Sequence, residues 1–468
     1  MQKIVHLGTK LGSFASAADS VAETLEITLT TKRVERLTER IGRERVDQRE
    51  LSIAEWEALP LITKLEAPAG VKAPDVACLS CDGGRMQRCD LPEDAKSRWC
   101  ETKVGVLMEI APNPHDEDPC PQVPDKFLDL VRMEKVTREI KGAVPKGQPF
   151  ASAKKSDPAL LDVSTSETST SETSTSETST SETSTSETST SNASTNADSR
   201  EPFSHPPETP PETPPETPPE KPPEKPPEKP PERVEIVAEP PVVESREVIA
   251  SLADSMAFGK QLAAKAWSLG FAAALLKAFI ADGSSTNWGI WQRHFKHLEF
   301  VPILDFIHAL TYVFSAAMAG RSREAGGPVY LRWITWIWQG EVTQVIAEVA
   351  ARMAELGPLP IDAAETDPRK VLADTLTYLT NQQSRMDYPT YRRMGLPITS
   401  SHIESAVKQV SRRVKGSEKF WTATGGEAVL QLRADQLSDT APLDTFWHQR
   451  PHQSTGTRNY NRTAKTTT

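Results

Sequence analysis

The chain has 468 residues, 37% of them hydrophobic and 25% charged, with a net charge of −10 at pH 7. This length and composition suffice for at least one large core, which excludes a protein that is disordered throughout. The acidic balance would argue against a polyanionic partner only if the acids were evenly spread, and many of them lie in repeats.

Residues 1–70 are predicted to be a helical region. Apolar residues recur at helical spacing in 14–25 and again in 34–41, which indicates two helices joined by a tight turn, with Thr30 or Thr31 as the N-cap of the second. The second helix is basic. It is therefore either the DNA-reading helix of a helix-turn-helix or a helix with a solvated, charged face.

Residues 71–162 are predicted to be the first part of an α/β core. The run DVACLSCDGGRM (75–86) is typical of a strand that ends at Asp82, before two glycines. The run CETKVGVLMEI (100–110) is typical of a second strand, so we expect a hairpin or meander.

Residues 163–233 are a low-complexity insert. SETST repeats begin at Ser166, and PPET and PPEK repeats begin at Pro206. Such segments have nothing to bury, so we expect a disordered linker whose second half is a stiffer polyproline II spacer.

The chain after the insert predicts the second part of the core at 234–308. Residues 242–270 have helical periodicity, 275–281 form an apolar strand-like run before Asp282, and a third such run ends at Asp305 and passes into a helix. Strands that alternate with helices predict a mixed α/β sheet with flanking helices.

The rest of the chain divides into three predicted segments. Residues 309–395 are helical throughout and form an all-helical insertion, and 396–440 contain a core helix. Residues 441–468 have no acid after Asp444 and are predicted to be a basic, disordered tail.

The compartment is predicted from what the sequence lacks. The first residues have no apolar segment and cleavage site of a secretory signal, and the most apolar stretch, 271–281, is too short to cross a bilayer. We expect a reducing, cytoplasmic location and no membrane span. The CxxC of Cys78 and Cys81 indicates either structural zinc or buried or free thiols.

Three acids stand where chemistry is expected. Asp82 and Asp282 each end a strand-like run, and Glu404 lies in the first turns of a helix. Carboxylates at strand ends point into one crevice, and a helix across that edge can supply a third. Hard oxygen ligands of this kind suit Mg²⁺ or Mn²⁺, and two such ions act on phosphodiesters in nucleases and strand-transfer enzymes.

Each acid also has an ordinary structural interpretation. Ser401 with Glu404 matches a capping box, and Glu404 with Lys408 matches an i, i+4 ion pair. Asp82 and Asp282 both precede glycine, which is typical of turn residues.

Several motifs resemble those of one family. SCDGGRM, RWCETKVGVL, IADGSSTNWGIW, ILDFIHAL and, most specifically, YRRMGLPITSSHIESAVKQVSRRVKGSEKFW resemble bacterial insertion-sequence transposases of the ISKra type, within the Mutator-like DDE group. The resemblance covers about 70–150 and 240–440. It implies an RNase H-like core, interrupted by a helical insertion, that cuts and joins transposon-end DNA with two Mg²⁺ or Mn²⁺ ions. It also implies a nucleoid-associated homo-oligomer on double-stranded DNA.

The resemblance assigns roles to five residues. Asp82, Asp282 and Glu404 correspond to the three catalytic acids and metal ligands. Asp305 and His308 match the Cys/Asp-x-x-His motif of related transposases, which implies a supporting role in orienting a strand end or a flipped base. Asp305 also ends a strand, so it remains an alternative to Asp282 as the second metal ligand.

The helix that carries Glu404 has one apolar and one basic side. Ile403, Val407, Val410 and Val414 form a predicted core stripe. The basic residues predicted to contact DNA phosphates are Lys408, Arg412, Arg413, Lys415 and Lys419. Two other functions remain open, namely an inactive or domesticated transposase that binds DNA without cleaving it, and an RNase H-like nuclease.

Overall fold

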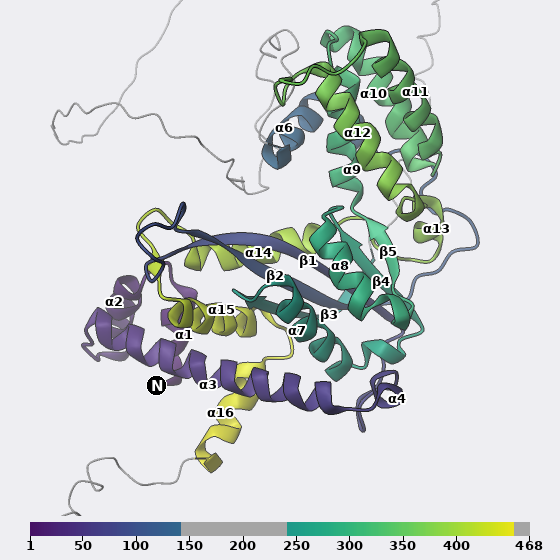
Figure 1. Ribbon diagram of the computed structural model, residues 1–468. Coiled ribbons are helices and arrows are strands. Elements are labelled where there is room, and N and C mark those ends of the chain that lie inside the picture. Colours follow the sequence, from purple (N-terminus) through teal and green to yellow (C-terminus); the bar gives the residue numbers. More distant parts are fainter. Residues whose placement is uncertain (142–240, 454–468) are drawn as a thin grey trace, which may run out of the picture. The chain divides into compact units, whose positions relative to one another are not determined.

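The computed structural model describes residues 1–141 and 241–453, apart from the side chains of 451–453 (Figure 1). The predicted insert at 163–233 lies outside the described residues, as do 454–468 of the predicted tail. No helix within the two described ranges is long and apolar enough to cross a membrane.

A mixed six-stranded sheet forms the centre of the described chain, which confirms the mixed α/β class. In spatial order the strands run β3-β2-β1-β4-β5, and β6 pairs with β1 beyond the end of β4. The β1–β2 and β2–β3 pairs are antiparallel, whereas the β1–β4 and β4–β5 pairs are parallel. The strands are β1 (Val76–Arg88), β2 (Trp99–Ile110), β3 (Val243–Ser251), β4 (Leu276–Ala281), β5 (Val301–Leu304) and β6 (Phe420–Trp421).

The long strand β1 changes neighbours along its length. Its antiparallel partner β2 accompanies it from Val76 to Gln87, but β4 pairs with it only as far as Ser80. The prediction that this strand ends at Asp82 is therefore wrong. What ends there is the parallel pairing, and Asp82 lies just past the last paired residues, at the carboxyl end of β4.

The segment 242–270 was expected to be helical throughout, and its first part is instead the strand β3. Its residues pair with β2 from Lys103 to Ile110, so the neighbouring strand overrides the local helical period. Helix α7 (Ser255–Ser268) then begins at Asp254, whose side chain accepts hydrogen bonds from the amides of Met256 and Ala257.

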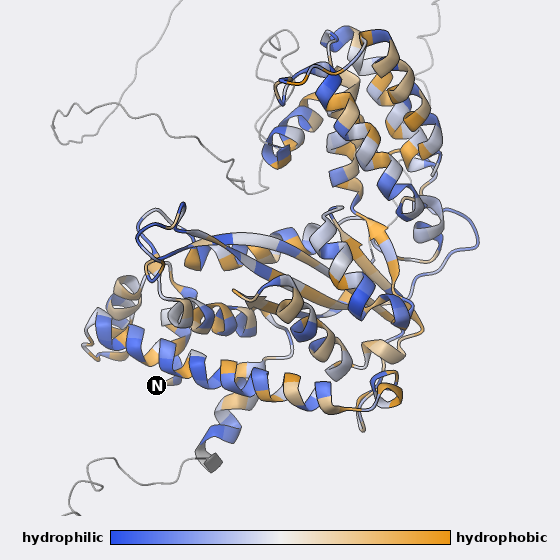
Figure 2. Cartoon of the chain, in the orientation of Figure 1, coloured by the Kyte–Doolittle hydropathy of each residue, from blue (hydrophilic) through white to orange (hydrophobic). Residues whose placement is uncertain are grey.

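Helices cover both faces of β1 and β2. A Cβ atom at Gly84 would lie 3.7 Å from Val407 of α14 (Ser401–Val414), so α14 packs on the face that also carries Asp82. A Cβ atom at Gly105 would lie 2.9 Å from Leu262 of α7 on the opposite face. Figure 2 shows β4 and β5 in hydrophobic colours, as expected of parallel strands buried between helices.

Five α-helices make up most of the segment between β5 and α14, which was predicted to be helical throughout, and 357–367 between two of them is irregular. Trp333 and Trp338 are buried in the core of this helical block, which supports a packing role for them. The helices are α9 (Phe306–Met318), α10 (Arg323–Trp338), α11 (Val342–Leu356), α12 (Pro368–Gln382) and α13 (Tyr388–Arg393). Helices α5 (Asp125–Leu128) and α6 (Leu130–Lys141), from the earlier part of the chain, precede the insert.

The N-terminal region is helical as predicted, and Thr30 is the N-cap of its long third helix. A first helix, α1, was not predicted. The basic side chains Arg33, Arg36 and Arg40 are exposed, as both a DNA-reading helix and a solvated face require, so the helix-turn-helix stays a prediction. The helices are α1 (Gln2–Lys10), α2 (Phe14–Leu25), α3 (Thr31–Ala58) and α4 (Leu61–Lys64).

Residues 442–453 form a helix where a disordered tail was predicted. After α14 come β6 and a buried helix, α15 (Ala423–Leu437), and then α16 (Pro442–Gln453). The disordered tail is wrong for α16, because Phe446 is buried in a cluster with Val5 and Ile41. Val5 and Ile41 belong to the N-terminal helices, so the sequence of the tail alone does not predict this packing.

Arg413 joins α14 to the N-terminal helices. Its guanidinium lies 4.4 Å above the ring of Phe14 and 4.9 Å from that of Trp421, and it donates two hydrogen bonds to the carbonyl of Gly8. The residue is only 2% exposed. The prediction that Arg413 contacts DNA is therefore wrong, because its charge is used inside the protein.

Replacing Arg413 tests this junction. We expect Arg413→Ala to lower the free energy of unfolding by about 3 kcal/mol, because the Gly8 carbonyl loses its donors and two rings lose their partner. The exposed neighbour Arg412 is the matched control, and Arg412→Ala should cost less than about 0.5 kcal/mol. Urea unfolding measures both values, and equal losses would contradict the assignment.

Candidate active site

Asp82 occupies the face of β1 beneath α14. Its Oδ1 accepts a hydrogen bond of 2.6 Å from the amide of Gly83. Burial raises the pKa of Asp82 to about 6, and repulsion from Asp282 adds to this; Glu404 also raises it, while His308 lowers it. The carboxylate therefore senses three other predicted site residues.

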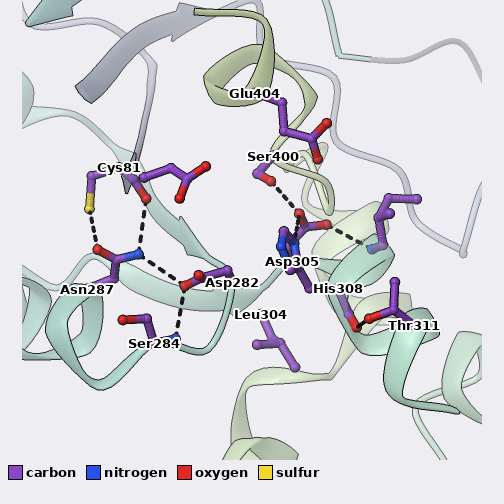
Figure 3. Close-up of polar contacts among 12 residues, drawn as sticks. Cys81, Asp282, Ser284, Asn287, Leu304, Asp305, His308, Thr311, Ser400 and Glu404 are labelled. Atoms are coloured by element: carbon purple, nitrogen blue, oxygen red, sulfur yellow. Dashed lines mark hydrogen bonds and ion pairs between the residues drawn. The ribbon is translucent and has the colours of Figure 1, made fainter. Parts of the chain in front are cut away.

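Asp282 follows β4 directly, in a turn that needs glycine. Gly283 has φ of +99°, and a Cβ atom there would collide with the ring of Tyr378. Oδ1 of Asp282 accepts hydrogen bonds from the amide of Ser284 at 2.9 Å and from Nδ2 of Asn287 at 3.0 Å (Figure 3). The turn interpretation is thus correct, and the charge of the same side chain also raises the pKa of Asp82.

Asp305 is the N-cap of α9 and is completely buried. Its Oδ1 accepts the amide of Ile307 at 2.8 Å, while Oδ2 contacts Nδ1 of His308 at 2.9 Å and accepts the hydroxyl of Ser400. Burial alone would raise the pKa of Asp305, but the hydrogen bond and charge of His308 leave it lowered. Both oxygens are committed within the protein.

His308 is the cation of the cluster. Burial on its own would lower the pKa of His308, but the hydrogen bond to Asp305 and the charges of Asp305, Asp282 and Asp82 raise it to about 9. The imidazole is therefore protonated at neutral pH and offsets part of the surrounding negative charge.

Glu404 points from α14 toward the Asp305–His308 pair (Figure 3). The capping-box interpretation is wrong, because Ser400 rather than Ser401 is the N-cap, and the Ser400 side chain makes no capping hydrogen bond. The ion pair with Lys408 exists, at 3.7 Å between Nζ and Oε2, and at a partly exposed position it contributes little. Burial and then the charge of Asp305 raise the pKa of Glu404.

The five predicted site residues are thus brought to one edge of the sheet. Within the described residues, Asp305, His308 and Glu404 are the one group of three whose ligand atoms all lie within 4.8 Å of one another. Asp82 and Asp282 are not in that group. Their charges nevertheless raise the pKa of His308, and the charges of His308 and Glu404 affect the pKa of Asp82.

The donor set fits hard divalent cations. Asp82, Asp282 and Glu404 are carboxylates, and a bound cation would relieve the repulsion that raises the pKa of Asp82. Both hydrogen bonds that described residues give to the Asp282 carboxylate end on Oδ1. Both oxygens of Asp305, by contrast, already accept hydrogen bonds from the chain, whereas Oδ2 of Asp282 accepts none from the described residues, which favours Asp282 over Asp305 as the ligand.

Three residues near the acids escaped the sequence analysis. Asn287 binds Asp282, Ser400 binds Asp305, and Tyr378 donates from Oη to the carbonyl of Asp282 at 2.8 Å. Asn287 and Ser400 lie within five residues of a predicted acid, which is the only local signal. Nothing near Tyr378 in the sequence marks it, because it comes from α12.

The remaining predictions concern cysteines and bases. All five cysteines are free thiols, and Cys78 and Cys81 are buried in β1. Lys408 and Arg412 are exposed on α14. Lys419 is partly buried, and its Nζ donates to the carbonyl of Arg412 at 3.0 Å. Lys415 is also partly buried, so the exposed bases near Glu404 are fewer than predicted.

The Asp305–His308 pair should make stability depend on pH. Because Asp305, followed by Asp282 and Asp82, raises the pKa of His308 from 6.5 to about 9, the contribution of the protonated imidazole is fully present below pH 6.5 and is lost as the pH rises through 9. Its size is about 3 kcal/mol. Asp305→Asn keeps an N-cap residue but removes the charge. In urea unfolding of the metal-free protein, we expect the variant to lose this dependence between pH 6.5 and 9.

Asp254→Asn is the matched control, since Asp254 caps α7 through two amides. It should leave the pH dependence unchanged. A wild-type slope that survives in Asp305→Asn would show that His308 titrates independently of Asp305.

Comparison of the chain with models of known protein families, with curated proteins and with solved structures found no match. The resemblance to ISKra-type transposases therefore depends on the sequence motifs alone.

Proposed function

We propose that the chain is a DDE-type transposase that cuts and joins transposon-end DNA. The proposal is carried by three acids, Asp82, Asp282 and Glu404, that lie far apart in the sequence. Their elements, β1, the turn after β4, and α14, meet at one edge of the sheet. Electrostatic effects on the pKa of Asp82 from both other acids support this convergence.

The topology supports an RNase H-like core within this proposal. Three antiparallel strands, β3, β2 and β1, are followed across the sheet by the parallel strands β4 and β5. The helical block lies between β5 and α14 in the chain. A catalytic acid on β1, another after β4 and a third on α14 match the positions that the family resemblance implies.

The residues divide the chemical work between them. Bound Mg²⁺ or Mn²⁺ supplies activation of the attacking oxygen and stabilisation of the leaving oxygen. Asp82, Asp282 and Glu404 are the residues that would hold the ions. Asp305, fixed at the start of α9, orients His308, whose imidazolium can donate a hydrogen bond to a phosphate oxygen at the same edge.

The exposed side of α14 provides a path for the DNA backbone. Lys408 and Arg412 follow Glu404 by one and two turns. Their charges attract phosphates without regard to sequence, so they would hold the strand beyond the site rather than select the transposon end.

Cleavage tests the proposed function. We expect the protein to nick a duplex that carries the transposon end in the presence of Mg²⁺ and to produce joined products with target DNA. Asp82→Asn and Glu404→Gln should each slow nicking about a thousandfold, equivalent to about 4 kcal/mol of barrier, because a ligand is lost. Gel electrophoresis of labelled duplexes measures both nicking and joining.

Glu418→Gln is the control, since Glu418 is exposed beyond the end of α14, and it should nick at the wild-type rate. DNA binding without nicking by the wild type would instead indicate an inactive transposase. Nicking without joined products would indicate a nuclease of the same fold.

Binding tests the basic side of α14 separately. Lys408→Gln and Arg412→Gln should weaken binding to transposon-end and scrambled duplexes alike, and each lost phosphate contact should reduce the salt slope by about 0.9. Fluorescence anisotropy at several salt concentrations measures this slope. Lys135→Gln, an exposed lysine of α6, is the control and should leave the slope unchanged.

A further inference from the structure

We propose that Asn287 and Cys81 are positioning residues that together fix Asp282 relative to β1, and so set the spacing between the first two acids of the site. The inference rests on the proposed function for its metal, but its evidence is the hydrogen bonding around Asn287. Neither residue was predicted to act in this way.

Asn287 bridges two strands at the point where their pairing stops. The last parallel pair of β1 and β4 is Ser80 with Ile280. Beyond it, the described backbone of β1 is no longer hydrogen-bonded to the chain that follows β4. Nδ2 of Asn287 donates to the carbonyl of Cys81 at 3.2 Å and to Oδ1 of Asp282 at 3.0 Å (Figure 3). One amide thus spans the gap, reaching the residue before Asp82 and the second acid itself.

The thiol of Cys81 completes the hydrogen bonding of the Asn287 amide. Its Sγ donates to Oδ1 of Asn287 at 3.4 Å. The carbonyl of Cys81 and the carboxylate of Asp282 can only accept hydrogen bonds, so the NH₂ group of Asn287 faces them. This leaves the amide oxygen of Asn287 facing the thiol, which is a weak donor.

The amide is enclosed, and the turn it serves is held from the other side as well. Asn287 is 8% exposed, so water does not compete readily for its hydrogen bonds. Tyr378 and Gln382 of α12 donate to the carbonyls of Asp282 and Gly283 at 2.8 and 3.1 Å. The helical block therefore holds the backbone of the turn, while Asn287 and Cys81 hold its carboxylate.

Metal selectivity distinguishes a positioning role from a merely structural one. Mg²⁺ demands near-ideal octahedral geometry with short ligand distances, and Mn²⁺ is the less demanding of the two. Displacement of Asp282 should therefore weaken the binding of Mg²⁺ more than the binding of Mn²⁺. Loss of an outer hydrogen-bond partner typically reduces metal affinity by about 10-fold to 100-fold.

The experiment measures Mg²⁺ and Mn²⁺ binding to the full chain by isothermal titration calorimetry, with urea unfolding of each variant. We expect Asn287→Ala to lower the affinity for Mg²⁺ at least about tenfold. The affinity for Mn²⁺ should fall by clearly less. Cys81→Ser keeps a donor and should bind like the wild type, whereas Cys81→Ala should show part of the Asn287→Ala loss. Asn381→Ala, at an exposed asparagine of α12, is the control.

The outcomes separate this proposal from the function on which it rests. Wild-type protein that binds neither ion would overturn the proposed function and the positioning role with it. Wild-type binding that survives unchanged in Asn287→Ala would overturn the positioning role alone, as would equal losses for Mg²⁺ and Mn²⁺. If Asn287→Ala does not fold, the Cys81→Ser and Cys81→Ala pair decides, because identical affinities in these two variants would refute the role of the thiol.

Discussion

Mutual repulsion among carboxylates at one edge of the sheet is the constraint on which the rest of the site depends. The imidazolium of His308 offsets part of it, and most directly for Asp305, whose pKa is lowered. The pKa values of Asp82 and Glu404 are raised instead, first by burial and then by neighbouring acids. Uncompensated negative charge therefore collects on the side chains proposed to bind metal, where a divalent cation is the natural counter-ion.

Hydrogen bonding separates the acid that connects structural elements, Asp305, from the acids that are proposed to bind metal. Asp305 uses both oxygens on the chain, linking α9, His308 and the start of α14 through Ser400. This explains why Ser400 does not cap its own helix and why Glu404 is not drawn into a capping box. The described residues support Asp282 at Oδ1 and leave Oδ2 without a hydrogen bond from them, so a ligand atom is available at the position where the proposed mechanism needs one.

Sequence patterns predicted those parts of the fold that depend on neighbouring residues. The β1–β2 hairpin, the strand before Asp282, the helix that begins after Asp305 and the helical block all follow from local periodicity and capping. The predictions failed where a distant partner decides. Pairing with β2 makes 243–251 a strand and carries β1 past Asp82. The ring of Phe14 and the carbonyl of Gly8, which contact Arg413, come from the opposite end of the chain. The acids themselves were identifiable, but the amide and hydroxyl groups that orient them were not.

The stacking of Arg413 between Phe14 and Trp421 also links the molecule mechanically. Arg413 and Glu404 belong to the same helix, and Nε1 of Trp421 donates to the carbonyl of Val414 at the end of that helix. The amino-terminal helices therefore pack against the carboxyl-terminal end of α14, whose first turn carries Glu404. A change in the position of those helices would therefore be passed along α14 to the residue that lies at the sheet edge.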